Sequence, residues 1–199
     1  MRSARPARGV FVLTAMLSLF YADSALAGDP AAKLADAEYL LTHEGRVMQA
    51  RREIDAVIAD CQPKNDTACL ANAYRLYGIL ARYGGSKDNP TILNLHPDAP
   101  PHPSAEEFDI SDGYFEQALT LYRQTQQLDL VANVSFMLAM NQMARGAPLK
   151  ACPYLDQAGV ALADARKQHP EKKITDVPGQ ASPEEGLAAA KKSAGCPAG

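Results

Sequence analysis

The sequence predicts an all-α protein made of about three antiparallel helix pairs. Apolar residues recur at spacings of three and four along most of the chain, which is typical of helices with one buried face. Glycines interrupt these stripes at Gly45, Gly85 and Gly146. No run alternates between apolar and polar residues for long enough to predict a strand.

Residues 1–27 have the organisation of a secretory signal peptide. Their apolar run, residues 10–20, is about half of the roughly 20 residues that a membrane-spanning helix needs. It lies between a basic start and the small-residue site Ala25-Leu26-Ala27, and the basic residues are Arg2, Arg5 and Arg8. We therefore expect an exported protein, in the periplasm first and secreted as the second choice.

The charge argues against two classes of partner. Cleavage after residue 27 removes three Arg and one Asp, which changes the formal net charge from −3 to −5. A mildly acidic chain lacks the basic footprint that nucleic acids or anionic membranes require. No later apolar run is long enough to span a bilayer, so no membrane insertion is expected after cleavage.

Four cysteines, Cys61, Cys69, Cys152 and Cys196, lie in the predicted mature chain. An even number in an exported chain predicts two disulfides, for which three connectivities exist. We expect Cys61 to pair with Cys69 across a polar turn, and Cys152 with Cys196 near the C-terminus. A metal site is disfavoured, because no Cys-x-x-Cys and no Cys/His pair has ligand spacing.

The first helix pair begins at Asp29-Pro30, which has the form of an N-cap followed by proline in the first turn. The expected apolar face of this helix consists of Leu34, Ala37, Leu40 and Leu41. Gly45 should end the helix. The second helix is expected at residues 47–61, with its buried face at Ala50, Ile54, Val57 and Ile58.

The second pair contains an insertion. A third helix is predicted over about 68–83, with one face at Tyr74, Tyr77, Gly78 and Ala81. Residues 86–103 read as a loop rich in Pro, Asn and Asp. A helix resumes near Ser104 or Asp109, with an apolar stripe at Phe115, Ala118, Leu119 and Tyr122.

The helix pairs share one register. Residues 5, 9 and 12 positions after the glycine are Ala50, Ile54 and Val57 in the first pair, and Ala151, Leu155 and Ala158 in the third. The second pair fits if 21 residues are inserted after Gly85, which aligns Ser111, Phe115 and Ala118.

The C-terminal part, residues 171–199, reads as a polar linker followed by a short helix. Ser182, Pro183 and Glu185 combine an N-cap, a first-turn proline and a capping-box acid, and Gly195 ends the helix after about Ala194. The repeat domain is thus expected at residues 28–170, and the last helix would cap it.

These offsets resemble the tetratricopeptide repeat. The first-helix signature of that family is similar to Tyr74, Tyr77, Gly78 and Ala81, and its second-helix signature is similar to Ala151, Leu155 and Ala158. The resemblance covers residues 31–165. The unit of 40 residues, the insertion, and Glu38 where the family has Gly or Ala are departures from its pattern.

The resemblance implies a TPR-like α-solenoid whose concave groove binds peptides. The residues that the repeat template places in this groove are Tyr39, Thr42, His43, Asn72, Arg75, Ile79, Arg82, Tyr83, Asn133, Phe136, Met140 and Met143. Arg75 and Arg82 would bind a carboxylate there. In the alternative interpretation, Ile79, Phe136 and the methionines pack between repeats and the arginines are solvated.

Two further features receive a structural and a functional interpretation. His96, Asp98 and His102 in the inserted loop make a metal site conceivable, although a loop that binds a partner or covers the groove is the preferred hypothesis. His43-Glu44 would pair as base and orienter in an enzyme, but a surface role beside Gly45 is preferred. No catalytic or cofactor motif is present, so we expect neither an enzyme nor a cofactor.

Two functions remain from the sequence. The first is a non-enzymatic exported adaptor or scaffold, which recognises a peptide segment or protein surface in the cell envelope through its helical-repeat groove. The alternative is a periplasmic immunity protein or inhibitor that neutralises one toxin or hydrolase. An adaptor would exchange among partners at micromolar strength, whereas a neutraliser would hold a single partner very tightly.

Overall fold

A computed structural model describes residues 28–86, 90–95, 98, 100, 102–170 and 182–197. The predicted signal peptide and the linker at 171–181 lie outside the described residues. All regular secondary structure in the described ranges is helical, which confirms the predicted all-α class.

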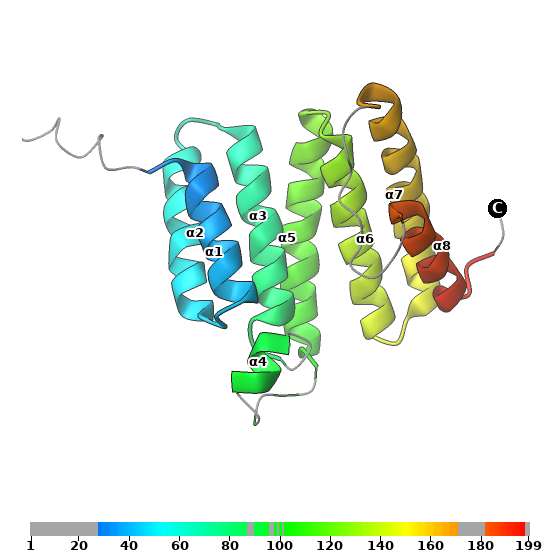
Figure 1. Ribbon diagram of the computed structural model, residues 1–199, viewed down its shortest axis with the longest axis horizontal. Coiled ribbons are helices and arrows are strands. Elements are labelled where there is room, and N and C mark those ends of the chain that lie inside the picture. Colours follow the sequence, from blue (N-terminus) through cyan, green and yellow to red (C-terminus); the bar gives the residue numbers. More distant parts are fainter. Residues whose placement is uncertain are drawn as a thin grey trace, which may run out of the picture.

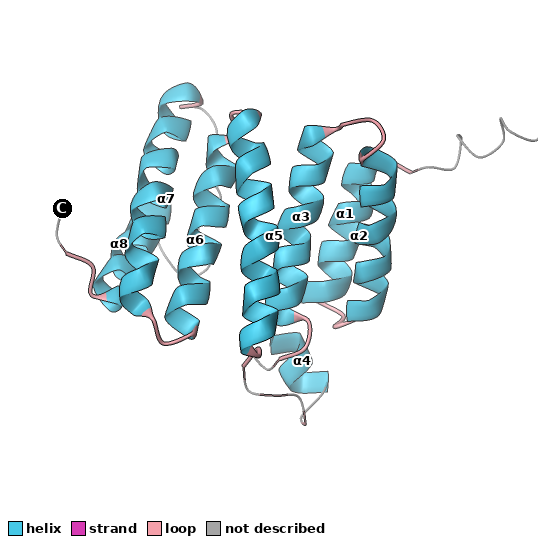
Figure 2. Ribbon diagram, turned by 180° about the vertical axis from the view of Figure 1, so that it is seen from behind, coloured by secondary structure: helices cyan, strands magenta, loops and turns pink. Residues whose placement is uncertain are grey.

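The long helices stand side by side in a row, from α1 and α2 at one end to α7 and α8 at the other, and the short α4 lies below this row, under α3 (Figure 1; Figure 2). In chain order they are α1 Pro30–Thr42, α2 Val47–Cys61, α3 Thr67–Tyr83, α4 Pro90–Leu95, α5 Ala105–Gln124, α6 Leu128–Ala144, α7 Pro148–Gln168 and α8 Pro183–Ala194.

The long helices pack as adjacent pairs. α1 packs on α2, α3 on α5, and α6 on α7, while α2–α3 and α5–α6 contacts join neighbouring pairs. α8 packs on α7 at the end of the row. The polypeptide therefore adds one helix pair after another along the long axis of the molecule.

Side chains at the helix starts satisfy backbone N–H groups that have no partner within the helix. Asp29 accepts a hydrogen bond from the Ala31 N–H (3.0 Å), as its predicted N-cap role requires. Ser182 accepts one from the Glu185 N–H (3.2 Å) at the start of α8. Ser104 and Glu107 form a capping box, so α5 begins at the earlier of its two predicted starts.

Two of the glycines that mark the repeat offsets adopt the left-handed backbone conformation. Gly45 has φ +63° and Gly146 has φ +72°, a region that favours glycine because it carries no Cβ. In both cases the next helix begins two residues later, at Val47 and at Pro148.

One helix was not predicted. α4 lies within residues 86–103, which the sequence analysis assigned to an irregular loop. Ile92 of α4 is only 3% exposed, and the Thr91 hydroxyl donates to the Thr42 carbonyl (2.6 Å). A helix of six residues is too short to show a 3.6-residue period, and its contact with the end of α1 is tertiary.

The aligned positions of the three second helices are all in the core. Each is at most 3% exposed: Ala50, Ile54, Val57, Ser111, Phe115, Ala118, Ala151, Leu155 and Ala158. One apolar cluster runs from α1 to α6 with contributions from α7, and a smaller one joins α6, α7 and α8.

α3 and α5 approach closely at Gly78. A Cβ on Gly78 would lie 2.6 Å from two ring carbons of Phe115, so the ring rests on the glycine backbone. The Ser111 hydroxyl, one helical turn earlier, donates to the Gly78 carbonyl (2.9 Å). Glycine is required here because its missing side chain is the space that Phe115 fills.

A polar cluster joins α5 to α6. The Asn141 side-chain amide donates to Ser111 Oγ (3.0 Å) and to Asp112 Oδ1 (2.7 Å). Arg145 forms ion pairs with Asp109 (2.7 Å) and Asp112 (2.9 Å). Burial raises the pKa of the Asp112 carboxyl, although the Asn141 hydrogen bond and the Arg145 charge act to lower it.

Both predicted disulfides are present. Cys61–Cys69 closes the turn between α2 and α3, and Cys152–Cys196 ties the end of α8 to α7. Within the ranges that the structure describes, no helix is both long enough and apolar enough to cross a bilayer.

The glycine contact can be tested by unfolding the oxidised mature chain in urea. We expect Gly78→Ala to destabilise the fold by about 1–3 kcal/mol, because the new methyl group overpacks against Phe115. The control is Gly113→Ala on α5, whose Cβ would meet no atom within 4 Å. It should stabilise the fold by up to about 1 kcal/mol. Equal effects of the two substitutions would contradict this account.

The two disulfides should contribute unequally. A chain-entropy estimate gives about 4 kcal/mol for a loop of 44 residues and about 2.5 kcal/mol for one of 8. We therefore expect Cys152→Ala/Cys196→Ala to lower the free energy of unfolding more than Cys61→Ala/Cys69→Ala. If the first variant unfolded at the wild-type urea concentration, α8 would not belong to the cooperative unit.

Candidate functional site

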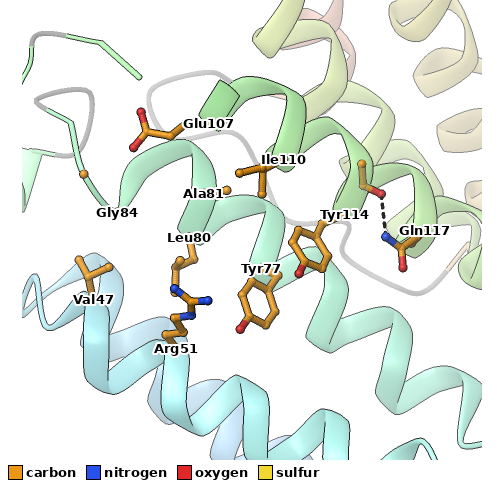
Figure 3. Close-up of a pocket in the computed structure, with 12 residues that line it drawn as sticks. Val47, Arg51, Tyr77, Leu80, Ala81, Gly84, Glu107, Ile110, Tyr114 and Gln117 are labelled. Carbon is orange, nitrogen blue, oxygen red and sulfur yellow. Dashed lines mark hydrogen bonds between the residues drawn. The ribbon is translucent and has the colours of Figure 1, made fainter. Parts of the chain in front are cut away.

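An open hollow of about 570 Å³ lies between α2, α3 and α5 (Figure 3). We call it the tyrosine hollow, and its lining residues are Val47, Arg51, Tyr77, Leu80, Ala81, Gly84, Gly85, Glu107, Ile110, Gly113, Tyr114 and Gln117. α2 and α5 form its sides and α3 its floor.

Stacked tyrosines form one end of the tyrosine hollow. The rings of Tyr77 and Tyr114 are 4.6 Å apart and nearly parallel, and Tyr74 lies 6.0 Å from Tyr114. Tyr77 precedes Gly78 and Tyr114 precedes Phe115 in the sequence, so the close contact of α3 and α5 also brings the two tyrosines together. These rings provide a rigid, amphipathic surface.

Arg51 extends along the α2 side of the hollow towards Tyr77 and Leu80 (Figure 3). Its side chain is 56% exposed and lies 4.0 Å from Asp55, which is exposed to a similar degree. The Tyr77 hydroxyl donates to the Asp55 carboxylate. Burial and, next, this hydrogen bond raise the pKa of Tyr77 to about 12, and contact with Tyr77 raises the pKa of Arg51.

A second hollow of about 520 Å³ continues from the first around the start of α2. We call it the arginine hollow, and it is lined by Gly45, Arg46, Val47, Met48, Gln49, Arg52, Gly84, Gly85 and Ile92. It shares Val47, Gly84 and Gly85 with the tyrosine hollow. The N-terminus of α2, which lies here, has no side-chain cap and carries the positive end of the helix dipole.

Exposed apolar side chains gather around these hollows. Met48 is 63% exposed and lines the arginine hollow, and Ile110 is 45% exposed and lines the tyrosine hollow. Leu95, 54% exposed, lies beside Gly45. In the described part of the chain the other large exposed apolar residues are Tyr39, Leu149 and Val160. Apolar side chains grouped around a hollow are typical of a binding surface.

The lining of the two hollows is mainly apolar and aromatic, with arginines as its main charged groups. Neither set of lining residues contains a His, Cys, Ser or Asp. The one acid, Glu107, accepts from the Ser104 N–H (2.7 Å) in the capping box of α5. What remains is an apolar and aromatic surface with arginines at its rim, which can bury a side chain and pair with a carboxylate.

The predicted groove residues lie elsewhere: none of them lines either hollow. On α1, Tyr39 is 54% exposed and stacks on His43 at 4.7 Å. On α3, Arg75 forms an ion pair with Glu38 (2.9 Å), and Asn72 accepts a hydrogen bond from the Tyr122 hydroxyl (2.7 Å).

Glu38 therefore supplies a carboxylate to Arg75 from within the chain. Burial lowers the pKa of Arg75 and the Glu38 charge raises it, with a net upward shift. Glu38 is the residue that departs from the repeat pattern, and its contact with Arg75 gives this departure a structural reason.

The remaining predicted groove residues divide between core and surface. Ile79 and Arg82 are buried, with 9% and 6% exposed. The Arg82 guanidinium lies over Phe108 (4.7 Å) and over Tyr83 (5.0 Å). On α6, Asn133 is exposed, whereas Phe136, Met140 and Met143 are half-buried, and α6 packs mainly on α5 and α7.

The inserted loop, for which binding a partner or covering the groove was preferred over a metal site, is only partly described. His96 lies outside the described residues, and Asp98 and His102 are exposed. Among the described residues, one set of potential ligand atoms lies close together, on Cys61, Asp66 and Cys69. Both sulfurs are joined in a disulfide, and Asp66 caps α3 by accepting from the Cys69 N–H (3.0 Å).

Sequence reasoning placed Tyr77 on a packing face and Arg51 on a solvated face. The signal for the hollow was present in the small residues that line it, Ala81, Gly84, Gly85 and Gly113, which leave space between α2, α3 and α5. Small residues also favour close helix packing, so their pattern alone does not distinguish a hollow from a tight contact.

Comparisons of the chain with models of protein families, with curated proteins and with solved structures gave no match.

The raised pKa of Tyr77 predicts a pH dependence of stability. In the unfolded chain tyrosine loses its proton near pH 10.0, whereas the folded chain holds that of Tyr77 to about 12. The contribution of Tyr77 to stability is thus fully present below pH 10 and is lost as the pH rises towards 12. Urea unfolding measured between pH 10 and 12 should show that the free energy of unfolding decreases less steeply with pH for Tyr77→Phe than for wild type. Equal slopes would contradict the assignment.

Proposed function

We propose that the chain is a non-enzymatic, exported protein-binding module that recognises a peptide segment or protein surface through the tyrosine and arginine hollows. The observation that carries the proposal is the gathering of exposed Met48, Leu95 and Ile110 around two continuous hollows. Exposed apolar groups gain free energy when a partner covers them, and rigid walls lower the entropy cost of binding.

The helix arrangement supports a TPR-like repeat as the architecture of this module. The common burial of the three aligned positions and the left-handed Gly45 and Gly146 are consistent with one repeating register. In that architecture α8 would act as the terminal cap, since it covers α7 with apolar residues, pairs Lys191 with Asp156 of α7 (2.7 Å) and leaves Lys192 exposed. The tyrosine hollow would then lie between the second helices α2 and α5, over the first helix α3, and not in the concave groove.

The disulfides support export. Two disulfides with no free cysteine among the described residues fit an oxidising compartment outside the cytoplasm. We propose the periplasm as that compartment and an envelope protein as the partner.

Site-specific photo-cross-linking tests the proposal. A photoreactive phenylalanine analogue at Ile110, in the tyrosine hollow, should give a discrete protein adduct in cells that export the chain. The control is the same analogue at Val160 on α7, which is 64% exposed and lines neither hollow. Mass spectrometry of the adducts identifies the partner. Absence of adducts at position 110, or the same adducts at both positions, would contradict binding at the hollows.

A further inference from the structure

We infer that the occupant of the two hollows is an acidic segment of a protein partner, with an apolar anchor side chain flanked by Asp or Glu. This inference rests on the proposed function and adds the chemistry of the ligand. It is carried by the charges that line the hollows and by their position relative to the apolar floor.

The first step is the charge of the lining. The residues that line the two hollows include three arginines, Arg46, Arg51 and Arg52, and one acid, Glu107. The complete chain, by contrast, has a formal net charge of −3. The side chains that line the hollows therefore carry a net charge of +2 on an acidic protein, and the carboxylates of Glu44 and Asp55, which pair with Arg46 and Arg51, lie outside this lining. Such a surface steers acidic segments towards it and repels basic ones.

The second step is how firmly these arginines are already paired. Arg51 and Asp55 are 4.0 Å apart and both more than half exposed, which makes a weak ion pair that solvent screens. Arg46 is 3.2 Å from Glu44 and 58% exposed. Arg52 is exposed and has no carboxylate partner among the described residues. Guanidinium groups thus remain accessible to a carboxylate of the partner.

The third step is the start of α2. Val47 and Met48 at this start line the arginine hollow, no side chain caps the helix, and the Gln49 N–H already donates to the Arg46 carbonyl (3.0 Å). A carboxylate placed there would receive hydrogen bonds from the backbone and from Arg52 together. The start of α2 thus lies beside Arg46 and Arg52, which line the same hollow.

The fourth step is the position of Arg51 relative to the apolar side chains of the tyrosine hollow. Arg51 shares the tyrosine hollow with Leu80, Ile110 and Tyr114. An aliphatic or aromatic side chain can therefore rest on the floor while neighbouring carboxylates of the same segment reach Arg51 and Arg52. Apolar burial supplies affinity in this arrangement, and the ion pairs supply selection and orientation.

The test uses the oxidised mature chain as the target for a phage-displayed library of random linear peptides. Enriched peptides are then synthesised and titrated against wild type and four variants. Arg51→Glu/Arg52→Glu reverses the rim charge. Its matched control, Arg123→Glu/Lys150→Glu, makes the same change of net charge at two exposed residues that line neither hollow. Gly113→Trp fills the tyrosine hollow from a position where a Cβ meets no atom within 4 Å.

We expect enriched peptides that combine Asp or Glu with an apolar residue. Their affinity should fall by about tenfold or more in Arg51→Glu/Arg52→Glu, stay unchanged in the charge control, and decrease with added salt. Arg51→Lys/Arg52→Lys should retain most of the binding, because the charge is preserved.

Two other outcomes separate the inference from the proposed function. Neutral or basic peptides that bind the charge-reversed variant as well as wild type, but are lost in Gly113→Trp, would overturn the acidic ligand and leave the binding function standing. Peptides that bind Gly113→Trp with undiminished affinity would contradict both the acidic ligand and the proposed binding at the hollows. A selection that enriches no peptide would contradict both as well.

Discussion

The contact between Gly78 and the ring of Phe115 sets how closely α3 and α5 approach. Because the ring lies on bare backbone, the neighbouring Tyr77 and Tyr114 come within stacking distance. The same approach lets Ser111 reach the Gly78 carbonyl and, through Asn141, joins α6 to α5. One missing methyl group therefore determines the packing of the middle helix pair, the wall of the tyrosine hollow, and the link to the last pair.

The polar groups of the molecule divide into two kinds. Those between helices are joined in ion pairs: Arg75 pairs with Glu38, and Arg145 pairs with Asp109 and Asp112, while the buried Nε atoms of both arginines have no hydrogen-bond partner among the described residues. Those around the hollows are exposed and only loosely paired, as for Arg51. Buried charges without partners are costly, so the first kind is required by folding. The exposed, loosely paired groups around the hollows are not required by the fold. This is consistent with the proposal that a partner binds there.

Local signals in the sequence predicted most of the helices but not the hollows. Asp29, Ser182 and Gly195 act through bonds to residues a few positions away, so their roles can be read directly from the chain. Cys61 and Cys69 flank one polar turn, so their pairing could also be predicted, and Cys196 then remained as the partner of Cys152. α4 and the burial of Arg82 depend on contacts with distant segments. Arg51 and Ile110, which face the tyrosine hollow, lie 59 positions apart, and no spacing rule brings them together.

The Cys152–Cys196 bond changes what a break in the chain would do. It closes a covalent ring that contains most of α7, the residues that connect α7 to α8, and α8 itself. A protease that cut once anywhere inside this ring would open it into a branched molecule without releasing a fragment. α8 would stay on α7 until a reductant reached the sulfurs, so in an oxidising compartment the last helix is protected against loss by single cleavage.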